Sequence, residues 1–524
     1  MINKNLWKYL SAVLLVSLMV LSAFTVSMNY NNSESFEEQY LKRFDERFES
    51  EASLGSPYET EKTCSYIINK VGTYYYALNG TTGRLQFYST NASYIINTAI
   101  TNSNEGSIYL TPANYTITSS ILSHGKNNIK LYSDGAWLVL NTSADCISLQ
   151  SVSGWMLEGL KIDGKYTSVQ SVYGVHLRQV NSTNLNSLYV QNVGNASYGG
   201  DIGLEGNCYE DVVKYCTCVG GGLGIHIWTS NTYGGDPSYD TVEHCLFKNQ
   251  LSNGIHVNGN WGTYGKPNHI TISYCDIFSA GDCAIEIGSG YPYANKILYC
   301  NTYNPVNTNY LVWGGYSDTK IDGCLAVGGS DGYYIGFSPS TWSHVTKFVE
   351  ISDSFAINIT GNDGFLAFNT EHVTFSHDVS LRAGWNGFEA RISNYTTFDS
   401  CESWDSDVSD YTGSGFQIGD GDDSATYKLY YNSVLNCRTG NTAGVTLQNY
   451  GVSFKKNALN STVQDTLFSN LQTNGIYITA TCNYTFINNN NFRPCTVTPM
   501  NNAGTGTIYG DNLWRDGAYN NIPD

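Results

Sequence analysis

The sequence contains few charged residues. Asp, Glu, Lys and Arg make up 14% of its 524 residues, whereas ordinary soluble domains contain roughly 25%. Proline is also scarce, with 10 residues, while Gly (52) and Tyr (41) are abundant. Because charged helix formers are missing, this composition favours β-strands and tight turns over helices. The hydrophobic content of 41% is enough for a large core and argues against a disordered chain.

Positively charged residues are especially few. The 27 Lys and Arg residues face 45 Asp and Glu residues, which gives a net charge of −18. Binding to nucleic acid requires a cationic surface, so we expect no nucleic-acid partner. Anionic membrane surfaces are disfavoured for the same reason. An acidic polysaccharide is compatible with this charge, because one local basic groove can hold it.

The N-terminus has the pattern of an export signal. Lys4 and Lys8 precede an uncharged stretch of 19 residues, Leu10 to Met28, that is rich in Leu and Val. A positive region followed by an apolar region is typical of secretory signals, and the stretch is also long enough to remain as a membrane anchor. We therefore predict a signal peptide or membrane anchor at residues 1–30 and an extracellular or cell-surface protein. Membrane contact is expected only through this segment.

A connector and a cap are predicted before the main body. Residues 31–62 are acidic and carry Phe36, Tyr40, Phe44 and Phe48 at spacings of four, which indicates an amphipathic helix. This helix is either a stalk or contact in a homo-oligomer, or a helix folded back on the main body. Residues 63–106 are predicted to form an N-terminal cap with a short helix that starts at Asn91. Residues 107–510 form the repeated body, and residues 511–524 form a tail.

The body consists of repeats that begin with glycine and continue as a short strand. Successive copies start 21 to 32 residues apart, apart from one interval of 48 that contains a degenerate copy at Asn309. Equivalent residues of such repeats stack on one another and build a continuous core. The copies start at Gly174, Gly203, Gly224, Gly254, Ala284, Gly332, Gly364, Gly387, Gly415, Gly444 and Gly475.

A series of cysteines keeps a constant phase with these copies. Cys216, Cys245, Cys275, Cys300 and Cys324 lie 8 or 9 residues before the copies that start at 224, 254, 284, 309 and 332. Two strands joined by a short turn, stacked in successive coils, explain this constant offset. Disulfides are one expectation for an exported protein, but a column of compact buried free thiols fits the stacking better. No Cys-x-x-Cys pair occurs among the 14 cysteines, so zinc is not expected.

These repeats resemble those of the pectate-lyase-like superfamily of right-handed parallel β-helices. The similarity covers roughly residues 63–510 and also includes Ser107-Ile108-Tyr109-Leu110 and Leu160-Lys161-Ile162-Asp163-Gly164. It implies an all-β, single-stranded right-handed solenoid with a short N-terminal capping helix. It also implies activity on polysaccharide, because the superfamily includes polygalacturonases, lyases, epimerases and tailspike-type depolymerases. The Gly-His-Gly motif and paired aspartates of polygalacturonases are absent, which puts that type of hydrolysis in doubt.

One outward-facing column is predicted to carry acid–base chemistry. The residue two positions after each glycine points outward, and five copies place His176, Glu205, His226, His256 and Glu286 there. A solvated face that accepts any polar residue is the alternative. The candidate catalytic residues are His226, His256, Glu286, Glu205 and Asp282. The candidate substrate-binding residues are Arg178, His176, Trp228, Asn258, Glu389 and Arg391.

The spacing of the carboxylates limits the reaction. Glu205 and Glu286 are three coils apart, or about 14 Å at one strand spacing per coil, too far for the acid pair of a glycosidase. Elimination or epimerisation needs only a base near the sugar C5 proton and a group that stabilises the carboxylate. This requirement tilts the balance slightly toward a lyase.

No cofactor or metal is required by these residues. Asp420, Asp422 and Asp423 resemble half of a Ca²⁺ loop, but no downstream bidentate Glu completes it, so an ordinary acidic turn is favoured. His226, His256 and Glu286 would stand in a line rather than around one point, which does not suit a metal.

The sequence therefore predicts a surface or secreted protein that binds polysaccharide or cell-surface glycan and cleaves it as a lyase or glycoside hydrolase. The competing hypothesis is a non-catalytic surface protein, an adhesin or envelope component that uses the solenoid as a spacer.

Overall fold

The computed structural model describes residues 64–513, except 166–171, 196–198, 260–264, 338–343, 409–412, 420–426, 443–444, 446 and 496. The chain divides into two units, Met1–Lys62 and Thr63–Asp524, and the described residues belong to the second. The predicted signal or anchor, the connector and the aspartates at 420, 422 and 423 lie outside the described residues. Among the residues that are described, none forms a helix long and apolar enough to cross a bilayer.

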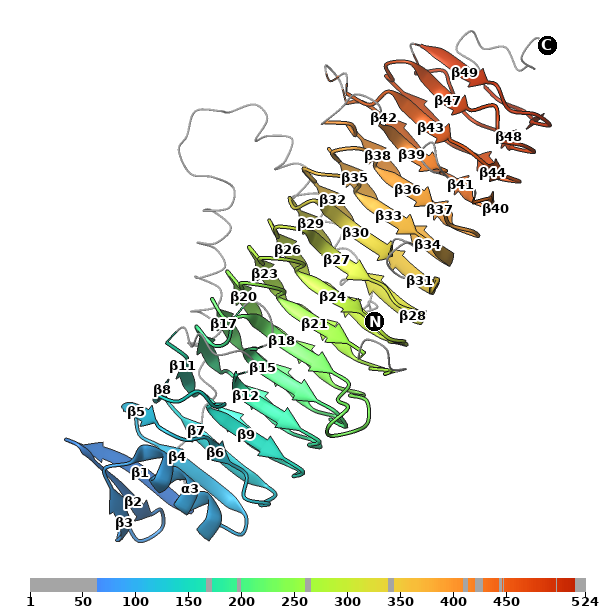
Figure 1. The fold of residues 1–524 in the computed structure, drawn as a ribbon. Helices are drawn as coiled ribbons and strands as arrows, with labels where there is room; N and C mark the ends of the chain where they lie inside the picture. Colours follow the sequence, from blue (N-terminus) through green and yellow to red (C-terminus); the bar gives the residue numbers. More distant parts are fainter. Residues whose placement is uncertain are drawn as a thin grey trace, which may run out of the picture. The chain divides into compact units, whose positions relative to one another are not determined.

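The described chain winds through three parallel sheets, and consecutive coils stack along one axis from the blue end to the red end of the ribbon (Figure 1). Sheet A contains β1 (Tyr66–Val71), β2 (Tyr74–Asn79), β3 (Leu85–Ser89), β4 (Gly106–Leu110), β7 (Ile129–Ser133), β10 (Met156–Glu158), β13 (Asn184–Asn186), β16 (Val212–Lys214), β19 (Thr241–Glu243), β22 (Thr271–Ser273), β25 (Lys296–Leu298), β28 (Tyr316–Asp322), β31 (Thr346–Ser352), β34 (Thr370–Ser376), β37 (Thr397–Asp399), β41 (Ser433–Leu435), β45 (Thr462–Gln464), β48 (Phe486–Asn488) and β50 (Ile508–Tyr509).

Sheet B contains β5 (Asn114–Ile117), β8 (Trp137–Leu140), β11 (Lys161–Asp163), β14 (Tyr189–Gln191), β17 (Thr217–Val219), β20 (Leu246–Lys248), β23 (Asp276–Phe278), β26 (Asn301–Tyr303), β29 (Leu325–Val327), β32 (Phe355–Ile357), β35 (Val379–Leu381), β38 (Glu402–Trp404), β42 (Arg438–Gly440) and β46 (Leu467–Ser469). A short separate pair is formed by β40 (Leu429–Tyr430) and β44 (Ala458–Leu459).

Sheet C contains β6 (Ile121–Leu122), β9 (Ile147–Gln150), β12 (Tyr173–Arg178), β15 (Gly200–Glu205), β18 (Leu223–Trp228), β21 (Ile255–Asn258), β24 (Ile285–Gly288), β27 (Thr308–Val312), β30 (Asp331–Gly336), β33 (Phe365–Phe368), β36 (Phe388–Arg391), β39 (Ser414–Ile418), β43 (Tyr450–Phe454), β47 (Asn474–Ile478) and β49 (Thr498–Asn502). This sheet carries the glycine-led copies that the sequence revealed.

Each coil passes from sheet A to sheet B to sheet C, as in β16, β17 and β18. The corner between sheets A and B requires a residue with positive φ, and Tyr215, His244, Tyr274 and Tyr299 adopt φ values of 53° to 55° there. Bulky residues rarely take this conformation. Their rings stack on one another at 5.2, 4.9 and 5.2 Å between centroids, which stabilises the exposed corner.

The N-terminal end is covered by a helix and a hairpin. Helix α3 (Ala92–Asn102) begins at Asn91, whose side-chain oxygen accepts a hydrogen bond from the Tyr94 N–H at 3.1 Å. Ile95, Ile96 and Ala99 of this helix are buried. The capping helix is therefore confirmed, and its polar cap and apolar face are those expected from the sequence. Beside it, β1, β2 and β3 pair antiparallel, and β1 pairs parallel with β4 at the start of sheet A.

The core consists of columns of inward-facing side chains, one residue per coil. Tyr310, Tyr333, Phe365, Phe388 and Phe416 stack at centroid distances of 4.5 to 4.9 Å. All 14 cysteines are buried and free, so the predicted column of free thiols is confirmed and the disulfide alternative is wrong. These thiols act as small core side chains whose S–H groups donate to backbone carbonyls.

Two of the predicted copies have the wrong register. In β15 the residue beside His176 is Gly203, so the copy at Gly203 is displaced by two residues and Glu205 lies beside Arg178. Asp201 stands where other copies have glycine. Farther along, β43 supplies the sheet C strand through Gly451 and Val452, so the copy assigned to Gly444 is also wrong.

Two buried aspartates stack at the corner that leads into sheet A. The carboxylate of Asp240 accepts a hydrogen bond from the Asp211 N–H at 2.9 Å, and that of Asp211 accepts one from the Thr183 N–H at 2.6 Å. Burial raises the pKa of Asp240 to about 7, and burial followed by the charge of Asp240 raises that of Asp211. In other coils Asn295 and Asn432 accept the same backbone bond without a charge.

We predict that Asp240→Asn stabilises the protein at pH 8 but not at pH 5. Because the folded pKa of Asp240 is raised, its contribution to stability is complete below the unfolded pKa near 4 and is lost as pH rises through about 7. Asparagine keeps the accepting oxygen and removes the ionisation. Thermal unfolding at pH 8 should shift upward by about 2 °C or more. The exposed Asp353→Asn should show no such difference between the two pH values, and an equal shift in both variants would contradict the explanation.

Candidate active site

The predicted acid–base column exists on the outer face of sheet C. His226 of β18 pairs with His256 of β21, and His256 pairs with Glu286 of β24. The residues on either side of them, such as Ile225 and Ile227, point into the core. Glu205 does not belong to this column, because the register places it between Arg178 and Trp228 in the neighbouring outward column. Both columns are nevertheless on one face and their side chains meet.

Four charged or titratable side chains form an ionic cluster at the start of this face. His176 lies between two carboxylates, with Nδ1 2.9 Å from Asp145 and Nε2 3.1 Å from Glu205. The Arg178 guanidinium contacts the same two carboxylates at 2.9 and 3.3 Å and donates to Ser148 at 2.7 Å. Arg178 is therefore neutralised, and a substrate carboxylate would meet no excess positive charge at this side chain.

The carboxylates of the ionic cluster stay ionised although they are largely buried. Burial raises the pKa of Asp145, but the hydrogen bond and charge of His176 outweigh it, so the net pKa is lowered. The pKa of Glu205 is lowered in the same way by His176 and by Ser230, whose hydroxyl donates to it at 2.7 Å. The sequence offered no signal for Asp145, because β9 has no leading glycine that marks it as a copy.

His226 is held neutral with both ring nitrogens occupied. Burial, and then the charge of His256, lowers its pKa well below the usual value. The Asn258 side-chain oxygen can only accept, so His226 donates from Nε2 to it at 3.2 Å. Nδ1 then accepts from the Tyr173 hydroxyl at 2.9 Å, and burial raises the pKa of Tyr173 so that it keeps this proton. Without breaking these bonds, His226 cannot transfer a proton to a ligand.

His256 and Glu286 form a dyad whose hydrogen bonding and exposure differ from those of His226. Glu286 accepts hydrogen bonds from the Trp313 indole N–H at 2.8 Å and the Asn253 amide at 2.6 Å. Burial alone would raise its pKa, but the charge of His256 and these bonds lower it to about 2. His256 Nε2 lies 3.6 Å from Glu286, and the His256 side chain is 19% exposed. Its Nδ1 makes no hydrogen bond to any residue that the structure describes.

Trp228, the predicted sugar platform, is braced by neighbouring rings. Its indole stacks on His226 at 4.2 Å and lies 5.4 Å from Tyr173, with interplanar angles of 17° and 21°. His226 in turn stacks on His256 at 5.2 Å. The rings fix one another in orientation, which gives the face the rigidity that a binding site needs.

The remaining predicted residues lie apart from the dyad. The Asp282 carboxylate accepts a hydrogen bond from Asn307 in the next coil at 3.1 Å. Glu389 lies four coils beyond Glu286, about 19 Å away at one strand spacing per coil. It is fully buried and receives two hydrogen bonds from Arg391 at 2.8 and 2.7 Å. Glu389 and Arg391 thus form a separate cluster.

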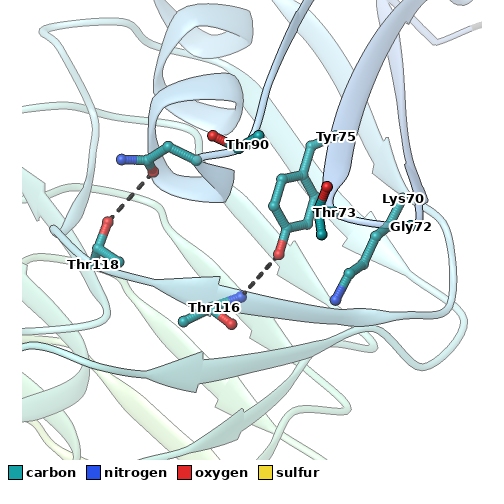
Figure 2. A pocket seen from close by; sticks show the side chains of 8 residues that line it. Lys70, Gly72, Thr73, Tyr75, Thr90, Thr116 and Thr118 are labelled. Atoms are coloured by element: carbon teal, nitrogen blue, oxygen red, sulfur yellow. Dashed lines mark hydrogen bonds between the residues drawn. The ribbon is translucent and has the colours of Figure 1, made fainter.

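A surface hollow of about 450 Å³ lies at the cap, away from these residues. Figure 2 shows the Tyr75 hydroxyl pointing toward Thr116, whose backbone N–H donates to it at 3.4 Å. The Thr118 hydroxyl donates to the Asn91 side-chain oxygen at 3.4 Å. Half of the hollow's lining residues are threonines, and Lys70 and Tyr75 are its titratable groups. It contains none of the predicted acid–base residues, so sheet C remains the candidate site.

We predict that Arg178→Ala destabilises the protein by about 1.5–3 kcal/mol, because it removes charge-assisted hydrogen bonds to Asp145 and Glu205 and leaves His176 as their remaining ion-pair partner. Chemical denaturation monitors the change. The matched control is Lys320→Ala, which removes the cation of an ion pair whose side chains are 43% and 55% exposed and should cost about 0–1 kcal/mol. Similar losses in the two variants would show that the ionic cluster contributes no more than a surface pair.

Three solved structures illustrate what the chain is similar to. An N-terminal fragment of gene product 12 of bacteriophage Phi29 has a TM-score of 0.53 and 11% identity, over 82% of this chain and 71% of that one. A PL6 alginate lyase in complex with a trisaccharide has a TM-score of 0.45 and 11% identity, over 68% of this chain and 83% of that one. The catalytic unit of a GH87 α-1,3-glucanase from Streptomyces thermodiastaticus has a TM-score of 0.41 and 14% identity, over 82% of this chain and 67% of that one.

No family model and no curated protein sequence matches the chain. At these identities the likeness to solved structures concerns the fold alone. The predicted fold class, an all-β right-handed parallel β-helix with an N-terminal capping helix, is confirmed.

Proposed function

We propose that this chain is an exported protein that binds extracellular polysaccharide on the outer face of sheet C and cleaves it beside His256. One observation carries the proposal. His256 is the partly exposed histidine of this face: 19% of its side chain is accessible and its Nδ1 makes no hydrogen bond to a described residue, whereas His176 and His226 are buried, and the adjacent Glu286 is held as a carboxylate. Export is supported by Lys4, Lys8 and the apolar stretch from Leu10 to Met28.

The arrangement suits proton abstraction. A general base must be accessible and correctly oriented, and His256 meets both conditions because Glu286 and the stacked His226 ring hold it in place. Glu286 cannot rotate freely, since Trp313 and Asn253 fix both of its oxygens. The dyad therefore resembles a base and its orienting carboxylate, in which the carboxylate also stabilises the protonated imidazole.

Elimination is the reaction that these groups support best. His256 removes the C5 proton of a uronate unit, the electron pair forms the C4–C5 double bond, and the C4–O bond breaks, so that the departing oxygen leaves as the new chain end and takes up a proton. A hydrolase would need a second carboxyl group within about 5 to 9.5 Å. Glu205 is three coils away from Glu286, and Asp282 is bound to Asn307.

A non-catalytic surface protein is the second candidate, and one observation favours it. Asp145, His176, Arg178 and Glu205 satisfy one another, and this mutual pairing leaves them little to offer a ligand. In that case the outer face of sheet C only stabilises the stack, and the protein serves as a spacer at the cell surface.

We predict that His256→Ala and Glu286→Gln each lower the rate of cleavage by about 100-fold or more. Purified protein is incubated with alginate, polygalacturonate and a neutral glucan, and new reducing ends and the absorbance of unsaturated uronate are measured. Glutamine keeps the shape of Glu286 and removes its charge. His244→Ala, which removes a histidine from the exposed corner between sheets A and B, should retain full activity.

The two readouts separate the mechanisms. Reducing ends with unsaturated uronate indicate elimination, whereas reducing ends alone indicate hydrolysis. Full activity in both dyad variants would remove His256 and Glu286 from the mechanism, and a folded wild-type protein without activity on any of the glycans would favour the spacer.

A further inference from the structure

Sheet A is locally lengthened in the coils that follow the dyad. Strands β28, β31 and β34 each contain seven residues, whereas β25 before them and β37 after them contain three. The added residues extend the sheet toward the corner with sheet C, where they border a second hollow of about 540 Å³. Its side chains include Tyr291, His344, Lys347, Phe348, Glu371 and His372.

The floor of the second hollow is a fixed aromatic stack. Phe348 stacks on His372 at 5.2 Å and His372 stacks on Tyr395 at 4.7 Å, with interplanar angles of only 4° and 7°. These residues occupy equivalent positive-φ corner positions in consecutive coils, so the strand register holds their rings in place. Phe348 is 41% exposed. A rigid, half-exposed ring is the group on which the apolar face of a sugar packs.

Polar groups surround this floor. The Tyr291 hydroxyl lies 3.2 Å from His344 Nδ1, and Lys347 forms an ion pair with Glu371, its direct neighbour across the two strands. The hollow thus combines a ring with hydroxyl, imidazole, ammonium and carboxylate groups. Such a mixture of an apolar platform and hydrogen-bonding groups matches a pyranose ring, which has an apolar face and a rim of hydroxyls.

The second hollow is connected to the dyad by two short chain segments. Trp313 donates to Glu286, and Gly315, two residues later, lines the hollow. Tyr291 follows Glu286 by five residues, and its ring packs so closely on Gly315 that a Cβ there would lie 2.2 Å from it. Only glycine allows this contact. The chain thus runs from Glu286 in sheet C to Tyr291 in the hollow within five residues.

We propose that the second hollow is a carbohydrate subsite that binds a further pyranose unit of the polysaccharide chain cleaved at the dyad, with Phe348 as its platform and Lys347 and Glu371 as hydrogen-bonding partners of the sugar hydroxyls. This inference rests on the proposed function. It adds a place where the substrate is held by binding alone, at a corner where no acid–base chemistry is required.

The experiment measures binding and cleavage separately. Native gel electrophoresis through alginate, polygalacturonate or a neutral glucan gives the dissociation constant from the retardation of the full chain. Phe348→Ala is expected to weaken binding about tenfold and to raise the glycan concentration needed for half-maximal cleavage by a similar factor. Tyr274→Ala is the matched control, because it removes a ring that is 51% exposed in the stack at another corner. His256→Ala should bind as the wild type does.

The outcomes separate the two proposals. Unchanged affinity in Phe348→Ala, in a protein that binds and cleaves a glycan, overturns the subsite and leaves the dyad in place. Affinity that depends on Phe348 in a protein that cleaves none of the glycans supports the subsite and overturns the cleavage proposal. A folded wild-type protein that none of the three glycans retards overturns both.

Discussion

The structure depends on one constraint, the in-register parallel hydrogen bonding of each strand to its equivalent in the next coil. This pairing places equivalent residues about 4.8 Å apart, so that from β4 onward a residue's partner in the next coil lies 22 to 36 positions away along the chain. Columns of Phe, Tyr and Cys in the core follow from it, and so do the stacks of rings at the corners. It also brings His226, His256 and Glu286 together from three separate coils.

The sequence was sufficient to predict those parts of the structure that repeat. Glycine-led strands and the constant phase of the cysteines predicted the stacking, and through it the order of His226, His256 and Glu286. The glycine that marks the start of a copy is replaced by Asp201 in β15, so the glycine pattern puts Glu205 in the wrong column. The intervals around Gly203, 29 and then 21 residues, become 27 and 23 when Asp201 is used, and this more even spacing was the available signal.

Residues that support the site could not be found in this way. Tyr173 and Asn253 lie at or before the start of their strands, and Trp313 follows the end of β27. Whether such residues reach His226 or Glu286 depends on the path of the chain at the corner and on side-chain rotamers, which no repeat encodes. Asp145 belongs to a coil without a recognisable copy. The periodic pattern thus predicts which coil a residue occupies, while the hydrogen bonds across the corner are fixed only in three dimensions.

The buried cysteine column has a consequence for how the protein must mature. Neighbouring thiols such as Cys245 and Cys275 stand one strand spacing apart, a distance within the range that disulfides span. All of these thiols are buried in the folded coils, and a thiol that oxidants cannot reach does not react. Once the coils have closed, the column is protected from oxidants. An unfolded chain has no such protection, so in an oxidising compartment the coils must stack faster than the cysteines cross-link.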